Sequence, residues 1–179
     1  MRKILLVDDK PENLYLLQSL LESNKIISIS ARNGKEALEI ARNNPPDIII
    51  SDILMPVMDG YSFCRECQKD SKLRTIPFIF YTATYTDKKD QEYALSLGAV
   101  RFILKPQEPQ AFMAIIHNVI SDVNKCTFYV NNTEPLSETV VLQGYNAALI
   151  RKLEDKMLLL EKTEKNTGNS KCSFISFNK

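Results

Sequence analysis

The first 120 or so residues alternate short apolar runs with amphipathic stretches, and this alternation constrains the fold more than any other feature. Some runs, such as Ile4-Leu5-Leu6-Val7, are continuously apolar, as expected for strands covered by helices on both faces. Strands that alternate with helices favour a parallel α/β sheet. The five predicted strands cover residues 3–7, 26–30, 47–51, 77–81 and 101–104.

Five amphipathic helices are predicted to follow these strands. Pro11 opens the first helix, at a position where its missing N–H is tolerated. Asn33 and Glu36 resemble a capping box at the start of the second helix, and Gly98 ends the fourth. The last three helices cover residues 61–69, residues 88–97 and a stretch that contains Phe112, Ile115, Ile116, Val119 and Ile120. The predicted architecture is therefore (βα)5.

Side chains that can carry chemistry follow the predicted strands at their carboxyl ends. Asp8 and Asp9 follow the first strand, Asp52 the third, Thr82 the fourth and Lys105 the fifth. Open α/β sheets place their functional groups at this edge, so we expect the five side chains to converge. Three carboxylates in one cleft require cations, namely Lys105 and a divalent ion such as Mg²⁺, with Mn²⁺ as the alternative. Such a set suits phosphoryl transfer.

The same residues lie in segments that resemble the receiver domain of two-component response regulators. The segments are Val7-Asp8-Asp9, Asp52-Ile53-Leu54-Met55-Pro56-Val57-Met58-Asp59-Gly60, Tyr81-Thr82-Ala83 and Phe102-Ile103-Leu104-Lys105-Pro106. Each motif alone is weak evidence, but their order and spacing are specific. The resemblance covers roughly residues 1–122 and implies a flavodoxin-like three-layer sandwich with sheet order 2-1-3-4-5.

The resemblance also implies the chemistry of the site. Asp52 would accept a phosphoryl group from the phosphohistidine of a sensor histidine kinase or a phosphotransfer protein. Asp9 would bind Mg²⁺ directly and Asp8 largely through water, while an Asp52 oxygen and the backbone carbonyl of Leu54 would complete the protein ligands. Lys105 would pair with the phosphoryl oxygens.

A switch is implied as well. Thr82 would donate its hydroxyl to the phosphoryl group, and Phe102, where Tyr is frequent in the family, would swing inward. The face of the fourth helix, fifth strand and fifth helix would then change shape and support a homodimer. The family also implies a cis peptide bond between Lys105 and Pro106. Gln107-Glu108-Pro109 departs from the family pattern and leaves the start of the fifth helix open.

The sequence after the receiver-like region has a different character. We expect a linker over residues 123–141, a long helix over 142–165 and a flexible tail over 166–179. The helix carries apolar residues at coiled-coil spacing with a stutter, which favours a partner helix over docking on the receiver. It resembles the signalling helix of receiver-containing hybrid histidine kinases, although no kinase sequence follows. A shortened hybrid-kinase relative and a free-standing regulator both fit.

Charge and composition exclude several classes of protein. Lys and Arg total 23 against 22 for Asp and Glu, and no helix-turn-helix pattern occurs, so nucleic-acid binding is not expected. No apolar stretch approaches the ~20 residues that span a bilayer, and we expect a cytoplasmic protein without membrane insertion. Cys64 and Cys67 form an isolated C-x-x-C, and His117 is the single histidine. Structural roles are favoured for the two cysteines, and a structural or surface role for the histidine.

Three functions follow from these observations. The leading prediction is a phosphoacceptor receiver that is not an enzyme, although it would phosphorylate and dephosphorylate itself. The alternative is a constitutive dimerisation or interaction module that uses the receiver fold and the coiled coil without a switch. A Mg²⁺-dependent phosphohydrolase is disfavoured, because Leu54, two residues after Asp52, offers no general acid. We interpret Asp59-Gly60 as a turn.

Overall fold

The computed structural model describes residues 2–83, 88–124, 150 and 157. The chain divides into two compact units, Met1–Leu136 and Ser137–Lys179, and the helices and strands below all belong to the first. The predicted linker, long helix and tail lie outside the described residues, apart from residues 123, 124, 150 and 157. Those predictions, and the predicted boundary of the receiver domain, remain predictions.

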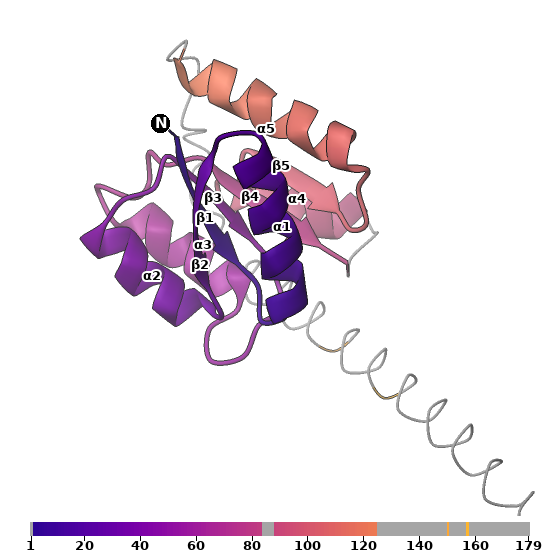
Figure 1. The fold of residues 1–179 in the computed structure, drawn as a ribbon. Coiled ribbons are helices and arrows are strands. Elements are labelled where there is room, and N and C mark those ends of the chain that lie inside the picture. The colour runs from indigo at the N-terminus through magenta and orange to yellow at the C-terminus, as the bar shows by residue number, and fades with distance from the viewer. Residues whose placement is uncertain (1, 84–87, 125–149, 151–156, 158–179) are drawn as a thin grey trace, which may run out of the picture. The chain divides into compact units, whose positions relative to one another are not determined.

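The first unit contains a parallel sheet of five strands in the order β2-β1-β3-β4-β5, as predicted (Figure 1). The strands are β1 (Lys3–Val7), β2 (Ile27–Ala31), β3 (Ile48–Ser51), β4 (Phe78–Thr82) and β5 (Arg101–Leu104). The predicted strand boundaries agree with these to within one residue. For example, β4 begins at Phe78 rather than Pro77, since proline has no N–H to donate to a neighbouring strand.

Helices cover both faces of the sheet and complete the three layers (Figure 1). They are α1 (Pro11–Ser23), α2 (Gly34–Asn43), α3 (Gly60–Lys69), α4 (Lys88–Ser96) and α5 (Pro109–Asn124). Helices α1 and α5 pack on one face, and α2, α3 and α4 pack on the other. The flavodoxin-like arrangement is therefore confirmed.

The core under α1 and α5 consists almost entirely of aliphatic side chains. Ile4 and Ile50 from the central strands meet Leu17 of α1 and Ile116 of α5, and all four are buried. The segment Gln107-Glu108-Pro109, which departs from the expected sequence pattern, does not disturb this packing. Helix α5 begins at Pro109 and buries Phe112, whose N–H donates to the Glu108 carbonyl. Proline is well suited to the first turn of a helix.

Two helix starts depend on side-chain caps. Asn33 caps α2 by accepting a hydrogen bond from the Glu36 N–H, as predicted. Asp59 caps α3 by accepting from the Ser62 N–H at 2.9 Å. The predicted turn at Asp59-Gly60 is therefore wrong in detail, because the Asp59 carboxylate satisfies a free N–H of the helix that Gly60 begins.

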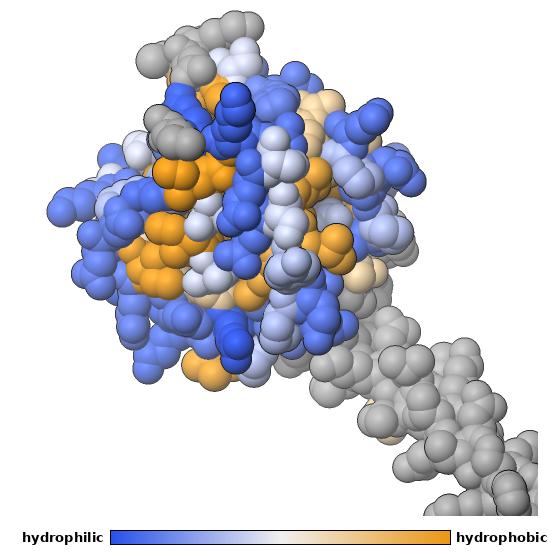
Figure 2. Space-filling view, viewed as in Figure 1, coloured by the Kyte–Doolittle hydropathy of each residue, from blue (hydrophilic) through white to orange (hydrophobic). Residues whose placement is uncertain are grey.

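The surface mixes hydrophilic and hydrophobic areas on the face shown in Figure 2. Within the described part of the chain, no helix is both long and apolar enough to cross a bilayer. His117 is exposed on α5, in agreement with the predicted surface role. Cys64 and Cys67 are free thiols on the buried face of α3, in agreement with a structural role.

Candidate functional site

The predicted acidic residues converge at the carboxyl edge of the sheet. Asp8 and Asp9 follow β1 and Asp52 follows β3, and one carboxylate oxygen of each lies within 4.8 Å of those of the other two. Strands β1 and β3 are hydrogen-bonded neighbours, with Val7 opposite Ser51. The parallel register therefore places residues that are more than 40 positions apart side by side.

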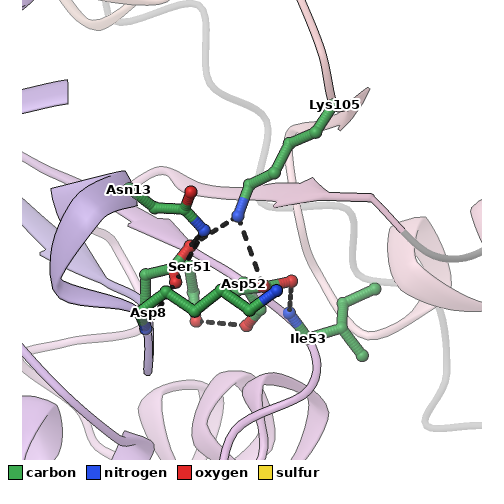
Figure 3. Close-up of polar contacts among 7 residues, drawn as sticks. Asp8, Asn13, Ser51, Asp52, Ile53 and Lys105 are labelled. Atoms are coloured by element: carbon green, nitrogen blue, oxygen red, sulfur yellow. Dashed lines mark hydrogen bonds and ion pairs between the residues drawn. The ribbon is translucent and has the colours of Figure 1, made fainter. Parts of the chain in front are cut away.

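Lys105 reaches these acids from the end of β5 (Figure 3). Its Nζ lies 2.5 Å from Asp8 Oδ2 and 3.2 Å from Asp52 Oδ2. The side chain of Lys105 is only 12% exposed, and those of Asp8 and Asp52 are 2% and 14% exposed. Little water separates these charges, so their attraction is stronger than that of a surface ion pair.

Asp8 is held by hydrogen bonds from α1 and the turn before it. The backbone N–H of Lys10 donates to Asp8 Oδ1 at 2.9 Å. The Asn13 side-chain amide donates to both Asp8 oxygens at 3.0 Å (Figure 3). Sequence reasoning missed Asn13. Its place in the first turn of the helix after Asp9 was the available signal, because that turn starts at the same edge of the sheet.

Asp52 is oriented by the segment in which it lies. Its Oδ1 accepts from the Ile53 N–H at 2.7 Å, and Oδ2 faces Lys105. The Ser51 hydroxyl donates to the Asp52 carbonyl at 2.7 Å. Gly60 packs so closely that an added Cβ would lie 2.2 Å from that carbonyl oxygen. The Asp52 carboxylate is thus oriented by a backbone hydrogen bond to one oxygen, while the Asp52 side chain remains 14% exposed to solvent.

Thr82 is the buried last residue of β4, and its carbonyl accepts from the Lys105 N–H at 2.7 Å. Phe102 is half-buried on β5, opposite Phe80, with ring centroids 6.5 Å apart. Because side chains alternate along a strand, Thr82 and Phe102 lie on the same face of the sheet. Phe102 is not part of the acidic cluster of Asp8, Asp9 and Asp52. The predicted switch residues are therefore neighbours across two strands.

The structure also describes the predicted cis peptide bond and the predicted backbone ligand Leu54. The peptide bond between Lys105 and Pro106 is cis, as the resemblance implied. Leu54 is half-buried in the loop that leaves Asp52. No described histidine, cysteine or further acid joins the acidic cluster, which contains Asp8, Asp9 and Asp52 alone.

The residues present fit a hard divalent cation. Among the described residues, three carboxylates face the single ammonium of Lys105, so negative charge is in excess at the cluster. Its ligand atoms are all oxygens, as Mg²⁺ prefers, and they lie within 4.8 Å of one another, close enough to share one ion. Mn²⁺ accepts the same ligands.

The sequence of the chain is similar to those of known proteins. The family model described as response regulator receiver domain matches residues 4–117. The chain is 36% identical over 126 residues to a probable transcriptional regulator ycf27 from Guillardia theta, which covers 70% of this chain and 48% of that protein. The chain spans about half the length of the first curated relatives it matches.

Another relative aligns over nearly the whole chain. A probable cyclic di-GMP phosphodiesterase from Vibrio cholerae is 30% identical over 172 residues, which covers 93% of this chain and 38% of that protein.

Solved structures agree with the family match. The signal receiver domain of a histidine kinase from Syntrophus aciditrophicus has a TM-score of 0.64 and 35% identity, and covers 76% of this chain and 98% of its own. The receiver domain of a sensor histidine kinase from Pseudomonas aeruginosa has a TM-score of 0.61 and 30% identity, and covers 65% and 95%. That structure has a magnesium ion coordinated in its active-site cleft.

Proposed function

The chain belongs to the response regulator receiver family, and on this premise we propose that it is a phosphoacceptor of a two-component phosphorelay with Asp52 as the acceptor. One observation carries the proposal. The Asp52 carboxylate lies at the sheet edge with one oxygen held by the Ile53 N–H and the other facing Lys105, beside Asp8 and Asp9. A carboxylate in this setting is oriented for attack on phosphorus, and the neighbouring ammonium can stabilise the negative charge of the transition state.

The donor would be the phosphohistidine of a sensor histidine kinase or of a phosphotransfer protein. An Asp52 carboxylate oxygen bonds to phosphorus while the bond from phosphorus to the histidine nitrogen breaks. The products are an acyl phosphate on Asp52 and a free imidazole. Lys105, already 3.2 Å from Asp52 Oδ2, would pair with the phosphoryl oxygens, and the Thr82 hydroxyl would donate to one of them.

The acidic cluster would hold the metal ion. Asp9 would bind Mg²⁺ directly and Asp8 largely through water, since Asp8 already accepts from Lys10, Asn13 and Lys105. An Asp52 oxygen and the Leu54 carbonyl would complete the protein ligands. When bound, the ion supplies neutralisation of negative charge on the phosphoryl oxygens.

The consequence of phosphorylation would be a change of shape. A group of about −1.5 to −2 charges attracts Lys105 and Thr82, and Phe102 then moves inward on the face that Thr82 shares with it. The surface of α4, β5 and α5 is the proposed dimer interface. The C-terminal segment is the proposed route to a partner.

The test is to incubate the purified chain with Mg²⁺ and acetyl phosphate and to look for an adduct that is stable in acid and labile in base. We expect wild type to form it and Asp52→Asn to form none. Asp47→Asn is the matched control, because Asp47 precedes the opposite end of the same strand. An adduct on Asp52→Asn, or none on wild type, would sink the proposal.

The same samples test whether the chain acts on external substrates. As a receiver in the cytoplasm it would turn over its own acyl phosphate only. We therefore expect no sustained hydrolysis of small phosphate esters such as p-nitrophenyl phosphate. Steady turnover that disappears in Asp52→Asn would instead favour a phosphohydrolase.

A further inference from the structure

Tyr81 contacts the site without being one of its acids or cations. The Lys105 Nζ lies over the Tyr81 ring, 5.1 Å from its centroid. Tyr81 precedes Thr82 on β4, so alternation directs its side chain to the sheet face opposite to that of Thr82. On that face it packs against the core under α1 and α5.

The Tyr81 ring is itself held in place from α5. Its centroid lies 5.0 Å from that of Phe112, with 48° between the ring planes. Phe112 is 1% exposed and belongs to the core. The aromatic face that Lys105 contacts is therefore supported by the packed interior rather than by a mobile side chain.

Lysine requires such support more than most cations. Its ammonium sits at the end of four flexible methylene groups, and ordering them is opposed by side-chain entropy. The two acids do not hold Lys105 equally, since Nζ lies 2.5 Å from Asp8 and 3.2 Å from Asp52. A third contact that is favourable at only one position of the ammonium would limit the movement of Lys105 between these two carboxylates.

We propose that Tyr81 is a positioning residue whose aromatic face holds the Lys105 ammonium beside Asp52. The interaction is a cation–π contact in a site where the lysine side chain is 12% exposed, and such contacts strengthen as water is excluded. The phenol hydroxyl takes no part, so phenylalanine can replace tyrosine. The role in phosphoryl transfer rests on the proposed function of Asp52.

The first test reads the lysine directly and does not depend on phosphorylation. Protons above an aromatic ring resonate upfield, so we expect upfield-shifted Lys105 Hε signals in wild type by NMR. Tyr81→Phe should retain that shift and Tyr81→Leu should abolish it. Phe112→Leu, which loosens the ring without removing it, should reduce the shift. A shift that is absent in wild type or unchanged in Tyr81→Leu overturns the proposal.

The second test measures the rate of Asp52 phosphorylation by acetyl phosphate in Mg²⁺. We expect Tyr81→Leu to be slower than wild type by about three- to tenfold and Tyr81→Phe to retain most of the rate, given the usual strength of cation–π contacts. Phe78→Leu is the control, since it removes a buried ring at the other end of the same strand. Equal slowing in Phe78→Leu and Tyr81→Leu would mean a general packing effect and would overturn the proposal.

A double-mutant cycle separates positioning from structure. If Tyr81 acts through Lys105, the added effect of Tyr81→Leu should disappear in a Lys105→Met background. The same slowing in both backgrounds contradicts the proposal. If wild type forms no adduct at all, the proposed function fails, while the NMR test still decides whether Tyr81 holds Lys105.

Discussion

At the scale of single residues, Val57 combines an unusual backbone with an exposed side chain. It has a φ of 69° and is 81% exposed in the loop between Asp52 and α3. β-branched residues rarely adopt the left-handed region, because Cβ approaches the following carbonyl oxygen. The strain lies five positions after the proposed phosphoacceptor, where unusual backbone conformations commonly occur.

We therefore expect Val57→Gly to raise the free energy of unfolding. Relief of strain of roughly 1–2 kcal/mol is partly offset by the larger entropy of the unfolded glycine chain, which leaves a gain of about 0.5–1 kcal/mol. Urea denaturation measures this gain. Val57→Ala is the matched control, because alanine keeps Cβ and with it most of the strain. If both variants have the same stability, φ strain is not the cause.

At the scale of elements, Asp47 connects the amino-terminal ends of β1 and β3. Its carboxylate accepts from the Lys3 N–H at 2.7 Å and forms an ion pair with Arg2 at 3.0 Å. Burial alone would raise the pKa of Asp47, but the Lys3 hydrogen bond and the Arg2 charge together hold that pKa below its usual 3.8. The charged form is therefore the one that stabilises the pairing of the two strands.

The sign of the pH dependence follows from this lowered pKa. The contribution of Asp47 is complete above pH 3.8 and is lost as pH falls through the folded-state pKa. We expect Asp47→Asn to lower the free energy of unfolding at pH 7, by no more than about 1 kcal/mol because the pair is partly exposed. The difference from wild type should shrink below pH 3.8 in denaturant titrations. A difference that does not change with pH would contradict this explanation.

Helix α3 carries a second element-scale feature, its pair of buried thiols. Burial raises the pKa of Cys67 to about 12 and raises that of Cys64 well above its usual range. Neither thiol forms the reactive thiolate at neutral pH. We expect both to resist iodoacetamide until α3 opens, so sub-denaturing urea should accelerate their labelling in peptide mass spectrometry. Labelling of the native chain at the rate of an exposed cysteine would contradict their burial.

At the scale of the whole molecule, the open question is whether phosphorylation changes the association of two copies. Sedimentation velocity of wild type with Mg²⁺ and acetyl phosphate, compared with Asp52→Asn under the same conditions, tests this. We expect the dimer fraction to rise in wild type alone, because only Asp52 can add the charge that reshapes the α4, β5 and α5 face. Equal dimerisation in both would favour the constitutive interaction module.

The sequence by itself determined the layers, the strand boundaries to within one residue and the convergence of Asp8, Asp9, Asp52 and Lys105, with Thr82 at the same edge of the sheet. Apolar periodicity is a local property of the sequence, and the rule that parallel strands end at one edge follows from the topology. Both can therefore be applied to the sequence without a structure. The strand order came from the family resemblance and was confirmed.

Only the tertiary structure decided how these side chains engage. It brought Asn13 to Asp8, placed the Tyr81 ring under Lys105 and used Asp59 as a helix cap rather than in a turn. Each of these depends on the direction of a side chain and on a distance of a few ångströms, set by packing between elements. Periodicity identifies the face on which a residue lies, but the partner on that face is chosen by the packing of the folded chain.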